Sequence, residues 1–424
     1  MVEGHKMKIK IGKALPLYKL VPIPEVVQGE GTVARIGELA LKMGIKKPLI
    51  VTDEILMQQG FIQDCMKSLE SNGLSYALYD KVLPNPTTEQ CNAGLAIYQS
   101  EKCDSLIAFG GGSPMDCCKM IGCLVSNPQP MASYAGFGKA TLFGLRKIPP
   151  LIAVPTTAGT GSETSAGAVV TLAEKKLKVV VADFGLVPKV AVLDPVVVKN
   201  LPQPITAATG MDALTHAVES YLSVWRRPAS GPLALYSVER VFKYLLRTYD
   251  NGHDMEAREQ MLRASFDAAS AFNMTNLGYV HAIAHQFGGL FHTPHGVANC
   301  MVLPLVLDFF ADGPDALVDD LANLAIAAGL GSHYETYDEA HKRALGRKFI
   351  AKVREMSAHM KVPTYVEGMK KEHVDDIVTR AFNEAHGLNN ALDFGYPIPK
   401  YLTHADAAKI VSSLLPPGER PSKL

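Results

Sequence analysis

The sequence predicts two successive domains of different class, an α/β domain over residues 1–200 and an all-helical domain over residues 201–424. In the first half, short apolar runs rich in β-branched residues alternate with segments of helical periodicity. This alternation, with short connections, is typical of a parallel sheet covered by helices on both faces. After about residue 200, nearly every segment repeats its apolar residues with the helical period, which indicates helices only.

Each strand of the first half is predicted from a short apolar run, at residues 48–52, 75–79, 105–109, 151–154 and 190–193. Between them, helical spacing predicts helices at residues 61–71, 89–100 and 114–125. The runs 168–172 and 178–182 flank a short polar segment and predict a hairpin. Residues 1–30 predict a short strand and an approach loop, and residues 127–150 predict a surface loop.

The second half predicts helices at residues 204–224, 231–248, 255–272, 276–289, 296–311, 315–328, 339–360, 373–385 and 404–414. At 424 residues and 47% hydrophobic composition, the chain is long enough for two or three sizeable cores. We see no internal repeat in the sequence.

Charge and cysteine content narrow the class of protein. The 42 basic side chains equal the 42 acidic ones, which argues against a nucleic-acid partner or an anionic membrane surface. No apolar run has the length of a transmembrane helix, and the first residues lack the apolar core of a secretion signal. The seven scattered cysteines form no metal-binding pattern and indicate reduced thiols, so we expect a cytoplasmic protein.

The densest group of metal-binding side chains lies in residues 278–296, which hold four of the thirteen histidines. His281 and His285 are four residues apart, so on a helix both project from one face. Two adjacent glycines weaken that helix, and Pro294 favours a turn that brings His295 back toward it. This stretch therefore predicts two imidazoles that converge on one point.

A second pair supplies the remaining metal ligands. Asp212 and His216 also stand four residues apart, among largely apolar neighbours, and a buried carboxylate is costly unless it is paired or binds a metal. Together the two stretches predict one oxygen and three nitrogen ligands, from Asp212, His216, His281 and His295. This donor set suits Fe(II), Zn(II), Mn(II) or Ni(II). For either stretch alone, a hydrogen-bonded pair without metal is the alternative.

Two glycine-rich loops follow predicted strands. Residues 110–116 enter a helix through three glycines, so their backbone N–H groups can approach a pyrophosphate; Ser113 can cap this helix and Pro114 suits its first turn. Residues 155–163 combine hydroxyl side chains with glycines. Ligands of open α/β sheets bind at the carboxyl ends of strands, so the two loops together predict a nucleotide site. Neither loop matches G-x-G-x-x-G, and a tight turn needs glycine in any case.

Asp53 ends the first clear strand, where two interpretations are open. Its carboxylate can bind the adenosine ribose and repel a 2′-phosphate, which favours NAD over NADP. It can equally be the N-cap of the following helix.

These motifs resemble those of the iron-containing (group III) alcohol dehydrogenases, which include lactaldehyde reductases and 1,3-propanediol dehydrogenases. The resemblance extends from about residue 17 to about residue 405. It rests on Gly-Gly-Gly-Ser-Pro-x-Asp at 110–116, Pro-Thr-Thr-Ala-Gly-Thr at 155–160, Gly-Met-Asp-Ala-Leu-Thr-His-Ala at 210–217, and the histidine stretch. It implies a dehydroquinate-synthase-like fold with a Rossmann-type NAD-binding domain, a helical metal-binding and catalytic domain, a cleft between them, and a homodimer or larger homo-oligomer.

The resemblance also assigns site residues. It implies the same four metal ligands, with Fe(II) as the expected ion, and it places His285 near the nicotinamide, where we expect it to relay a proton. The residues expected to bind NAD are Asp53, Gly110, Gly111, Gly112, Ser113, Asp116, Thr156, Thr157, Thr160 and Lys178. The substrate pocket is expected to include Asn85, Gly167 and Phe272. Gly167 replaces a larger residue of some relatives, which predicts a roomier pocket, and the role of His292 is open.

The expected reaction is hydride transfer between NAD and a small primary alcohol, short diol or aldehyde, with the metal acting as Lewis acid. Three alternatives are open from the sequence. One is a glycerol-dehydrogenase-like or dehydroquinate-synthase-like enzyme of the same fold, the second is a metal-dependent hydrolase that needs no nucleotide, and the third is a metal-binding or assembly protein without catalysis.

Overall fold

The computed structural model describes residues 2–14, 21–127, 130–142, 148–172, 174, 177–388 and 394–420. The chain divides into two compact units. The mixed unit comprises residues 20–201 and 253–266, and the helical unit comprises residues 1–19, 202–252 and 267–424. The main boundary lies next to the predicted one at residue 200, but the first residues of the chain group with the helical unit.

The mixed unit is built on a parallel sheet, as the sequence predicts. Within the described residues it has six strands in the order β1-β9-β6-β4-β2-β3, all neighbours being parallel. The strands are β1 (Glu25–Gln28), β2 (Pro48–Val51), β3 (Ala77–Tyr79), β4 (Ser105–Gly110), β6 (Leu151–Pro155) and β9 (Val190–Leu193). Strands β2, β4, β6 and β9 are buried along their whole length, which explains their continuous apolar runs.

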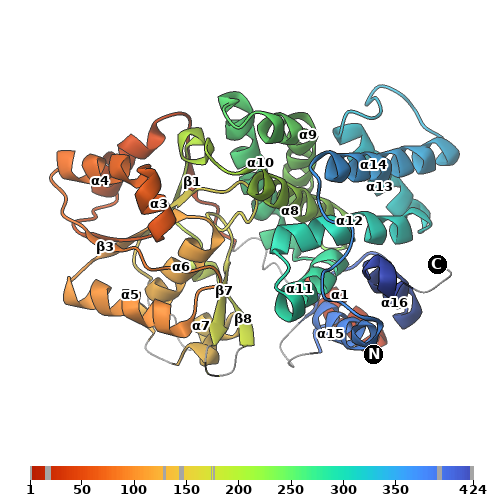
Figure 1. The fold of residues 1–424 in the computed structure, drawn as a ribbon, viewed down its shortest axis with the longest axis horizontal. Helices are drawn as coiled ribbons and strands as arrows, with labels where there is room; N and C mark the ends of the chain where they lie inside the picture. Colours follow the sequence, from red (N-terminus) through yellow and green to blue (C-terminus); the bar gives the residue numbers. More distant parts are fainter. Residues whose placement is uncertain are drawn as a thin grey trace. The chain divides into compact units, whose positions relative to one another are not determined.

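Helices cover this sheet and connect its strands (Figure 1). They are α2 (Ile36–Lys42), α3 (Glu54–Gln59), α4 (Ile62–Ser71), α5 (Thr88–Ser100), α6 (Gly112–Ser126) and α7 (Lys139–Leu142). Helix α6 packs on β4, the strand that leads into it. The predicted hairpin is confirmed as β7 (Gly167–Leu172) and β8 (Leu177–Ala182), with the short strand β5 (Gly136–Phe137) beside β8.

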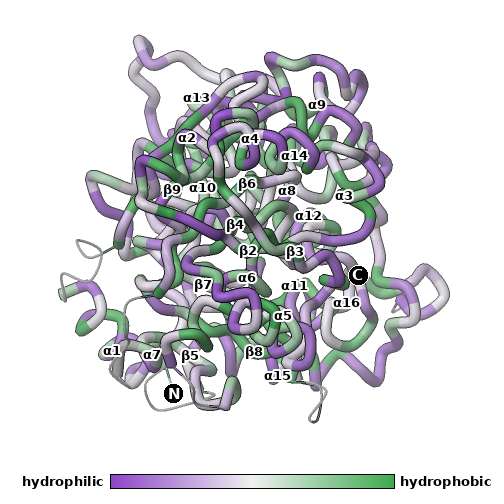
Figure 2. Tube along the Cα trace, turned by 90° about the vertical axis from the view of Figure 1, so that its left-hand side faces the viewer, coloured by the Kyte–Doolittle hydropathy of each residue, from purple (hydrophilic) through white to green (hydrophobic). Residues whose placement is uncertain are grey.

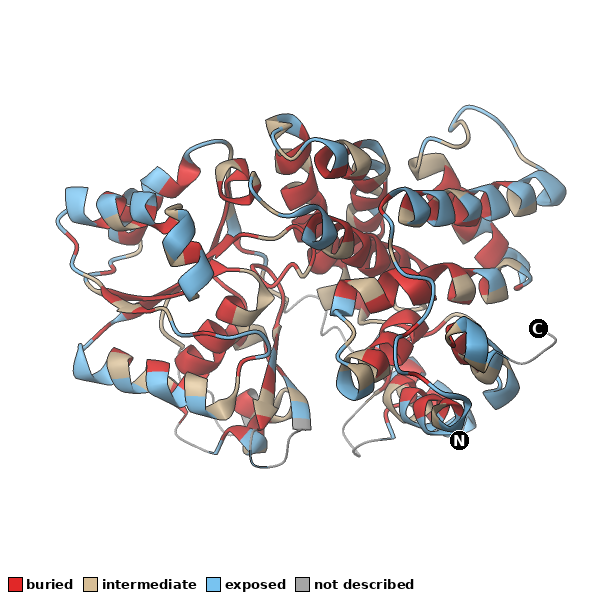
Figure 3. Cartoon of the chain, in the orientation of Figure 1, coloured by how far each residue is buried: buried red, intermediate tan, exposed pale blue. Residues whose placement is uncertain are grey.

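The helical unit confirms the predicted helices to within a few residues. They are α8 (Gln203–Leu222), α9 (Ser230–Asp250), α11 (Tyr279–Phe291), α12 (His295–Ala311), α13 (Asp315–Ala327), α14 (Glu339–His359), α15 (Val374–Ala385) and α16 (His404–Ser413). Helix α10 (Met255–Thr275) contributes to both units. Hydrophobic and hydrophilic residues alternate along most helices (Figure 2), whereas α8 is buried over most of its length (Figure 3).

Short 3-10 helices complete the described elements: η2 (Thr32–Arg35), η3 (Met131–Tyr134), η5 (Phe184–Leu186), η6 (Pro195–Val198), η7 (Lys371–His373) and η8 (Pro417–Glu419). Among the described residues, no helix is both long enough and apolar enough to cross a membrane.

The amino terminus differs from the prediction. The predicted short strand is present as β1, but residues 2–14 form helix α1 (Val2–Ala14), which the sequence did not predict. Its turns are fixed by distant residues, because the His5 imidazole bonds the hydroxyl of Tyr401 at 2.8 Å and Trp225 donates to the carbonyl of Ile9 at 2.9 Å. These contacts lie about 200 or more positions away along the chain, so local periodicity does not reveal this helix.

Candidate active site

The four predicted metal ligands come from three helices of the helical unit. Helix α8 supplies Asp212 and His216, α11 supplies His281, and α12 supplies His295. Helix α11 runs through its two glycines and ends at His292, which adopts a left-handed conformation (φ 55°). Pro294 then precedes the first residue of α12. The predicted helix, break and return is confirmed, and His292 forms the break.

Ligand atoms of these four side chains all lie within 4.8 Å of one another. The carboxylate oxygen Oδ1 of Asp212 is 3.9 Å from Nε2 of His216, 3.8 Å from Nε2 of His281 and 3.4 Å from Nε2 of His295. A tetrahedral ion with bonds of about 2.1 Å separates its ligands by about 3.4 Å, so the cluster is close to the size that a divalent ion requires.

Exposure distinguishes one side of the cluster from the others. The side chains of Asp212, His216 and His281 are 3%, 6% and 1% exposed, whereas that of His295 is 42% exposed. An ion held here would be enclosed by the first three ligands and accessible beside the fourth. Access of this kind lets a small molecule reach the ion, which a catalytic metal site requires and a closed structural site does not provide.

Close helix approach brings the ligands together. Gly296 follows His295, and a Cβ atom at this position would lie 2.0 Å from the carbonyl oxygen of Ala208 on α8. Only glycine therefore lets the start of α12 lie this near to α8. Gly278, just before α11, is equally constrained, because its Cβ would lie 2.7 Å from a carboxylate oxygen of Glu219.

Glu219 holds His281 in place. Its Oε2 accepts hydrogen bonds from Nδ1 of His281 at 2.6 Å and from the backbone N–H of Gly278 at 2.9 Å, and its Oε1 accepts from the N–H of Val280 at 2.7 Å. Because Nδ1 donates its proton to Glu219, Nε2 is left with a lone pair directed toward the cluster. This carboxylate–imidazole arrangement is the one that orients metal-binding histidines.

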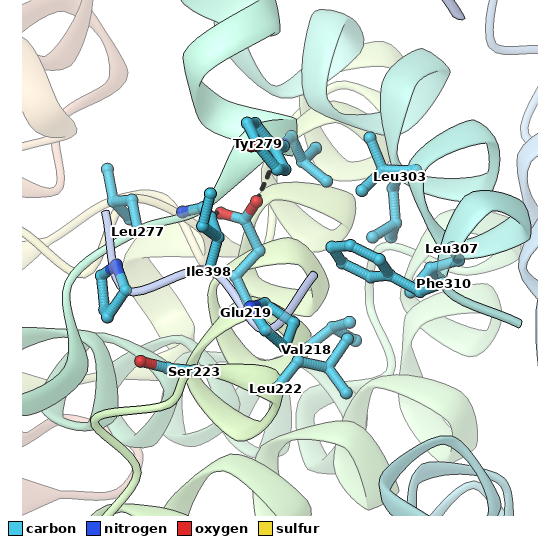
Figure 4. A pocket seen from close by; sticks show the side chains of 15 residues that line it. Val218, Glu219, Leu222, Ser223, Leu277, Tyr279, Leu303, Leu307, Phe310 and Ile398 are labelled. Atoms are coloured by element: carbon cyan, nitrogen blue, oxygen red, sulfur yellow. Dashed lines mark hydrogen bonds between the residues drawn. The ribbon is translucent and has the colours of Figure 1, made fainter. Parts of the chain in front are cut away.

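Apolar side chains surround Glu219 on its other side. Leu303, Leu307 and Phe310 of α12 line a pocket next to it (Figure 4). This cavity of about 20 Å³ holds about one water molecule, which is too small for an alcohol substrate. Its low polarity strengthens the hydrogen bonds of the carboxylate.

Asn299 and the imidazoles set the charge state of Asp212. Asn299, four residues after His295 on α12, is fully buried and donates from Nδ2 to Oδ1 of Asp212 at 2.8 Å. Burial raises the pKa of Asp212, but the neighbouring histidines outweigh this effect and hold the pKa well below its usual range. The carboxylate is therefore an anion and a strong ligand at neutral pH.

His285 lies beside the cluster but outside it. Its ring stacks on that of His295, with 5.2 Å between ring centroids. Nδ1 of His285 bonds Oε1 of Glu384 at 2.5 Å. The Glu384 carboxylate also accepts from the hydroxyl of Tyr396 at 2.7 Å and from Nε2 of Gln286 at 2.9 Å. These bonds fix the orientation of the His285 ring and, in the neutral imidazole, place the proton on Nδ1 and the lone pair on Nε2.

The two glycine-rich loops of the mixed unit lie against each other. A Cβ atom on Gly111 would be 3.1 Å from the side chain of Thr157, and one on Gly112 would be 3.2 Å from that of Thr160. The backbone N–H of Thr156 also donates to the carbonyl of Gly110 at 3.0 Å. The structure therefore brings the predicted loops into one cradle at the carboxyl ends of β4 and β6.

Helix α6 begins two residues earlier than the sequence predicts. Gly111 is the N-cap and the helix starts at Gly112, so the prediction that Ser113 caps it is wrong. The Ser113 hydroxyl instead accepts from the backbone N–H of Asn85 at 3.3 Å. The N-terminal amides of α6 consequently lie in the glycine turn itself, where the helix dipole favours an anion.

The other predicted residues of the mixed unit are placed as follows. Asp53 is the N-cap of α3, and its Oδ1 accepts from the N–H of Leu56 at 2.9 Å. Lys178 donates to Oδ1 of Asn85 at 2.7 Å. A Cβ on Gly167 would meet nothing within 4 Å, so this position has open space beside it.

Two predicted residues have partners within the protein. The oxygens of Asp116 accept from the hydroxyl of Ser162 at 2.8 Å and from the N–H of Val169 at 2.9 Å. In the helical unit, the ring of Phe272 lies on that of His216, with 4.6 Å between ring centroids. Phe272 thus borders the ligand cluster.

Our sequence reasoning missed the residues that hold the histidines. Asn299 shows a usable signal, because it stands four residues after His295 on the same helix face, and Glu219 stands three after His216. The position of Glu384 in the sequence gives no such signal, because Glu384 lies 99 residues from His285 and contacts it only through tertiary packing.

Comparison with known proteins agrees with this geometry. Residues 24–195 match the family model described as iron-containing alcohol dehydrogenase, and residues 206–396 match that of the Fe-containing alcohol dehydrogenase family, C-terminal. The chain belongs to the iron-containing alcohol dehydrogenase family. The family models cover the parallel sheet, both glycine-rich loops and all four candidate ligands, whereas helix α1 lies outside them.

Relatives within the iron-containing alcohol dehydrogenases span nearly the whole chain. Alcohol dehydrogenase 4 of Schizosaccharomyces pombe is 38% identical, over 92% of this chain and 89% of its own. NAD-dependent methanol dehydrogenase of Bacillus methanolicus is 33% identical, over 92% and 98%. The crystal structure of a 1,3-propanediol oxidoreductase superposes with a TM-score of 0.83 at 33% identity, over 93% and 98%. These findings do not favour the lyase, hydrolase or assembly alternatives.

Proposed function

We propose that the protein is a metal-dependent, NAD-linked alcohol dehydrogenase that interconverts small primary alcohols or short diols and their aldehydes. The convergence of Asp212, His216, His281 and His295 on a site open beside His295 carries this proposal. The names of the relatives support both the reaction and NAD as cofactor.

The donor set fits a divalent ion, and the family favours Fe(II), with Zn(II), Mn(II) and Ni(II) as other candidates. When bound, the metal supplies Lewis acidity and NAD supplies the hydride acceptor. Asp212 contributes the one negative charge of the ligand set, and Glu219 keeps Nε2 of His281 available for coordination. His285 accepts the alcohol proton at Nε2, because its Nδ1–H group already donates a hydrogen bond to Glu384.

We propose that the cradle in the mixed unit holds the dinucleotide. Backbone amides of Gly110, Gly111, Gly112 and Ser113 bind the pyrophosphate, together with the hydroxyls of Thr156, Thr157 and Thr160. Asp53 binds the adenosine ribose through Oδ2, because Oδ1 is engaged by the helix cap. Lys178 contacts the cofactor, and Asn85, Gly167 and Phe272 border the substrate.

We further propose a cytoplasmic homodimer or larger homo-oligomer, in which residues 1–200 bind NAD and residues 201–424 bind the metal. All seven cysteines are unpaired and buried, as expected for a reducing compartment.

One experiment tests the function directly. Metal content is measured on protein purified without oxygen, and NADH absorbance is followed with alcohols, diols and aldehydes of two to six carbons. We expect about one divalent ion per chain and an NAD-linked oxidation. Metal-loaded protein that changes no NADH absorbance with any of these compounds would refute the proposal.

The His285 assignment has its own test. His285→Ala removes the proton acceptor but no ligand, so we expect turnover to fall by about 10²–10⁴-fold with unchanged metal content. Phe291→Ala, on the same helix and away from the ligands, is the control. Unchanged turnover in His285→Ala would show that another group relays the proton.

A further inference from the structure

One charged side chain of the mixed unit has no role in the function proposed so far. Lys119 lies on α6, two turns after the glycine-rich loop, and is only 1% exposed. A buried ammonium group is costly unless hydrogen bonds and opposite charges compensate it. The hydrogen-bond partners and opposite charges around Lys119 therefore indicate its structural role.

All its hydrogen bonds go to the end of the second loop, at Ser162, and to the residues that follow it, Ser165 and Gly167. Nζ lies within hydrogen-bonding distance of four oxygens, which share its three N–H groups: the hydroxyl of Ser162 at 2.9 Å, the hydroxyl and carbonyl of Ser165, each at 2.9 Å, and the carbonyl of Gly167 at 2.8 Å. Asp116, one turn earlier on α6, accepts from the same Ser162 hydroxyl and from the N–H of Val169. Two side chains of helix α6, Asp116 and Lys119, thus form hydrogen bonds with residues 162–169.

Opposite charge keeps the ammonium stable in this position. Burial lowers the pKa of Lys119 to about 8, and the carboxylates of Asp116 and Glu163 oppose that lowering. Glu163 is itself 1% exposed and burial raises its pKa to about 7, so it is only partly ionised at neutral pH and Asp116 is the principal counter-charge. Lys119 therefore remains largely protonated at neutral pH. All its hydrogen-bond partners belong to the mixed unit.

The segment of residues 162–169 begins within the second glycine-rich loop, residues 155–163. That loop touches the first glycine-rich turn at Gly111 and Gly112, through Thr157 and Thr160. Helix α6 therefore carries the first loop at its N-terminus and anchors the second loop through its side chains. The relative position of the two loops, and so the shape of the cradle, depends on this anchor.

We infer that Lys119, supported by Asp116, is a positioning residue of the dinucleotide site, which fixes the two glycine-rich loops in the arrangement that binds the pyrophosphate of NAD. This inference rests on the proposed function. It assigns Asp116 an indirect role, through Ser162 and Lys119, in place of direct contact with the cofactor.

Lys119→Met tests the inference, because methionine keeps the apolar stem and removes the ammonium group. We expect the Kd for NADH, measured by NADH fluorescence, to rise at least tenfold. The KM for NAD should rise similarly, with kcat at saturating NAD within about twofold of wild type and metal content unchanged. A residue that only stabilises the fold would lower the melting temperature without moving the Kd. Lys67→Met, an exposed lysine on α4, is the matched control.

Ser165→Ala removes one acceptor of the ammonium with a minimal change in volume, and we expect it to raise the Kd about two- to fivefold. If Lys119→Met does not fold, this variant decides alone, and an unchanged Kd overturns the inference. A folded Lys119→Met protein with the wild-type Kd also overturns it. Wild-type protein that binds no NADH would instead overturn the proposed function itself, so the two failures are distinguishable.

Discussion

Glu219 gives the sharpest test of the metal centre, because it is not one of the four candidate ligands and is hydrogen-bonded to one of them, His281. Its carboxylate accepts three hydrogen bonds, from Nδ1 of His281 and from the N–H groups of Gly278 and Val280. Glu219→Gln keeps the shape of the side chain but turns one accepting oxygen into a donating NH₂ group. At least one of the three donors then faces another donor.

The size of the effect follows from these contacts. Loss of a hydrogen-bonding partner that orients a ligand histidine lowers metal affinity by about 10–100-fold, or about 1.4–2.7 kcal/mol. A buried donor without acceptor costs a further 1–3 kcal/mol, roughly, in the free energy of unfolding. The melting temperature of the metal-free variant should therefore fall as well.

The assay is competition for Zn(II) or Co(II) between the protein and a chelator of known affinity, with circular dichroism to verify the fold. Glu239→Gln, on the exposed side of α9, is the control and should bind metal like wild type. If Glu219→Gln folds and retains the wild-type metal Kd within about threefold, Glu219 does not orient His281 and our reading of the centre fails.

Three further predictions test other parts of the molecule. Burial lowers the pKa of both His5 and His386 from 6.5 to about 4, so folding favours their neutral forms. Above pH 6.5 both histidines are neutral in the folded and the unfolded chain. As the pH falls toward 4, protonation favours the unfolded chain, and the free energy of unfolding decreases by about 3 kcal/mol for each histidine. The hydrogen-exchange protection factors of residues 2–14, which correct for the intrinsic slowing of amide exchange in acid, should fall over this range; pH-independent protection factors would contradict this. Gly296→Ala should lower stability by about 1–3 kcal/mol and weaken metal binding, since its Cβ would lie 2.0 Å from a carbonyl oxygen of α8. Gly289→Ala, which meets nothing within 4 Å, is its control in thermal unfolding, and equal losses in both would count against the argument. Asp53→Gly should improve the use of NADP relative to NAD in steady-state assays, and an unchanged ratio would exclude Asp53 as the discriminating group.

Much of the fold is encoded in local patterns. The buried parallel strands are continuous apolar runs, and the helices of the second half follow their periodicity to within a few residues. The ligand pair of α8 was visible for the same reason, because a spacing of four places Asp212 and His216 on one face whatever surrounds the helix. The turn that brings His295 back was predicted from Pro294, which restricts the backbone of Thr293, whereas the left-handed conformation of His292 was not predicted.

Other features have no local signal. Helix α1 carries mixed, weakly periodic residues, and its structure depends on contacts with Tyr401 and Trp225. The predicted cap at Ser113 was wrong by two residues, since the helix is capped at Gly111 and starts at Gly112. Helix termini depend on where the chain can approach its neighbours, and at this point the neighbours are Thr157 and Thr160.

The sequence by itself determined the types of element and the chemistry available on each of them, because side-chain spacing and backbone preference act over a few residues. Tertiary structure alone decided that side chains of three helices converge at Asp212 and that Glu219 and Glu384 each form a hydrogen bond with one histidine of α11. It also decided that Lys119 forms hydrogen bonds with the residues at and after the end of the second loop. The physical reason is distance along the chain. These contacts join residues 43 to 99 positions apart, and only tertiary packing, as at the close approach of helices at Gly296, brings such groups within hydrogen-bonding range.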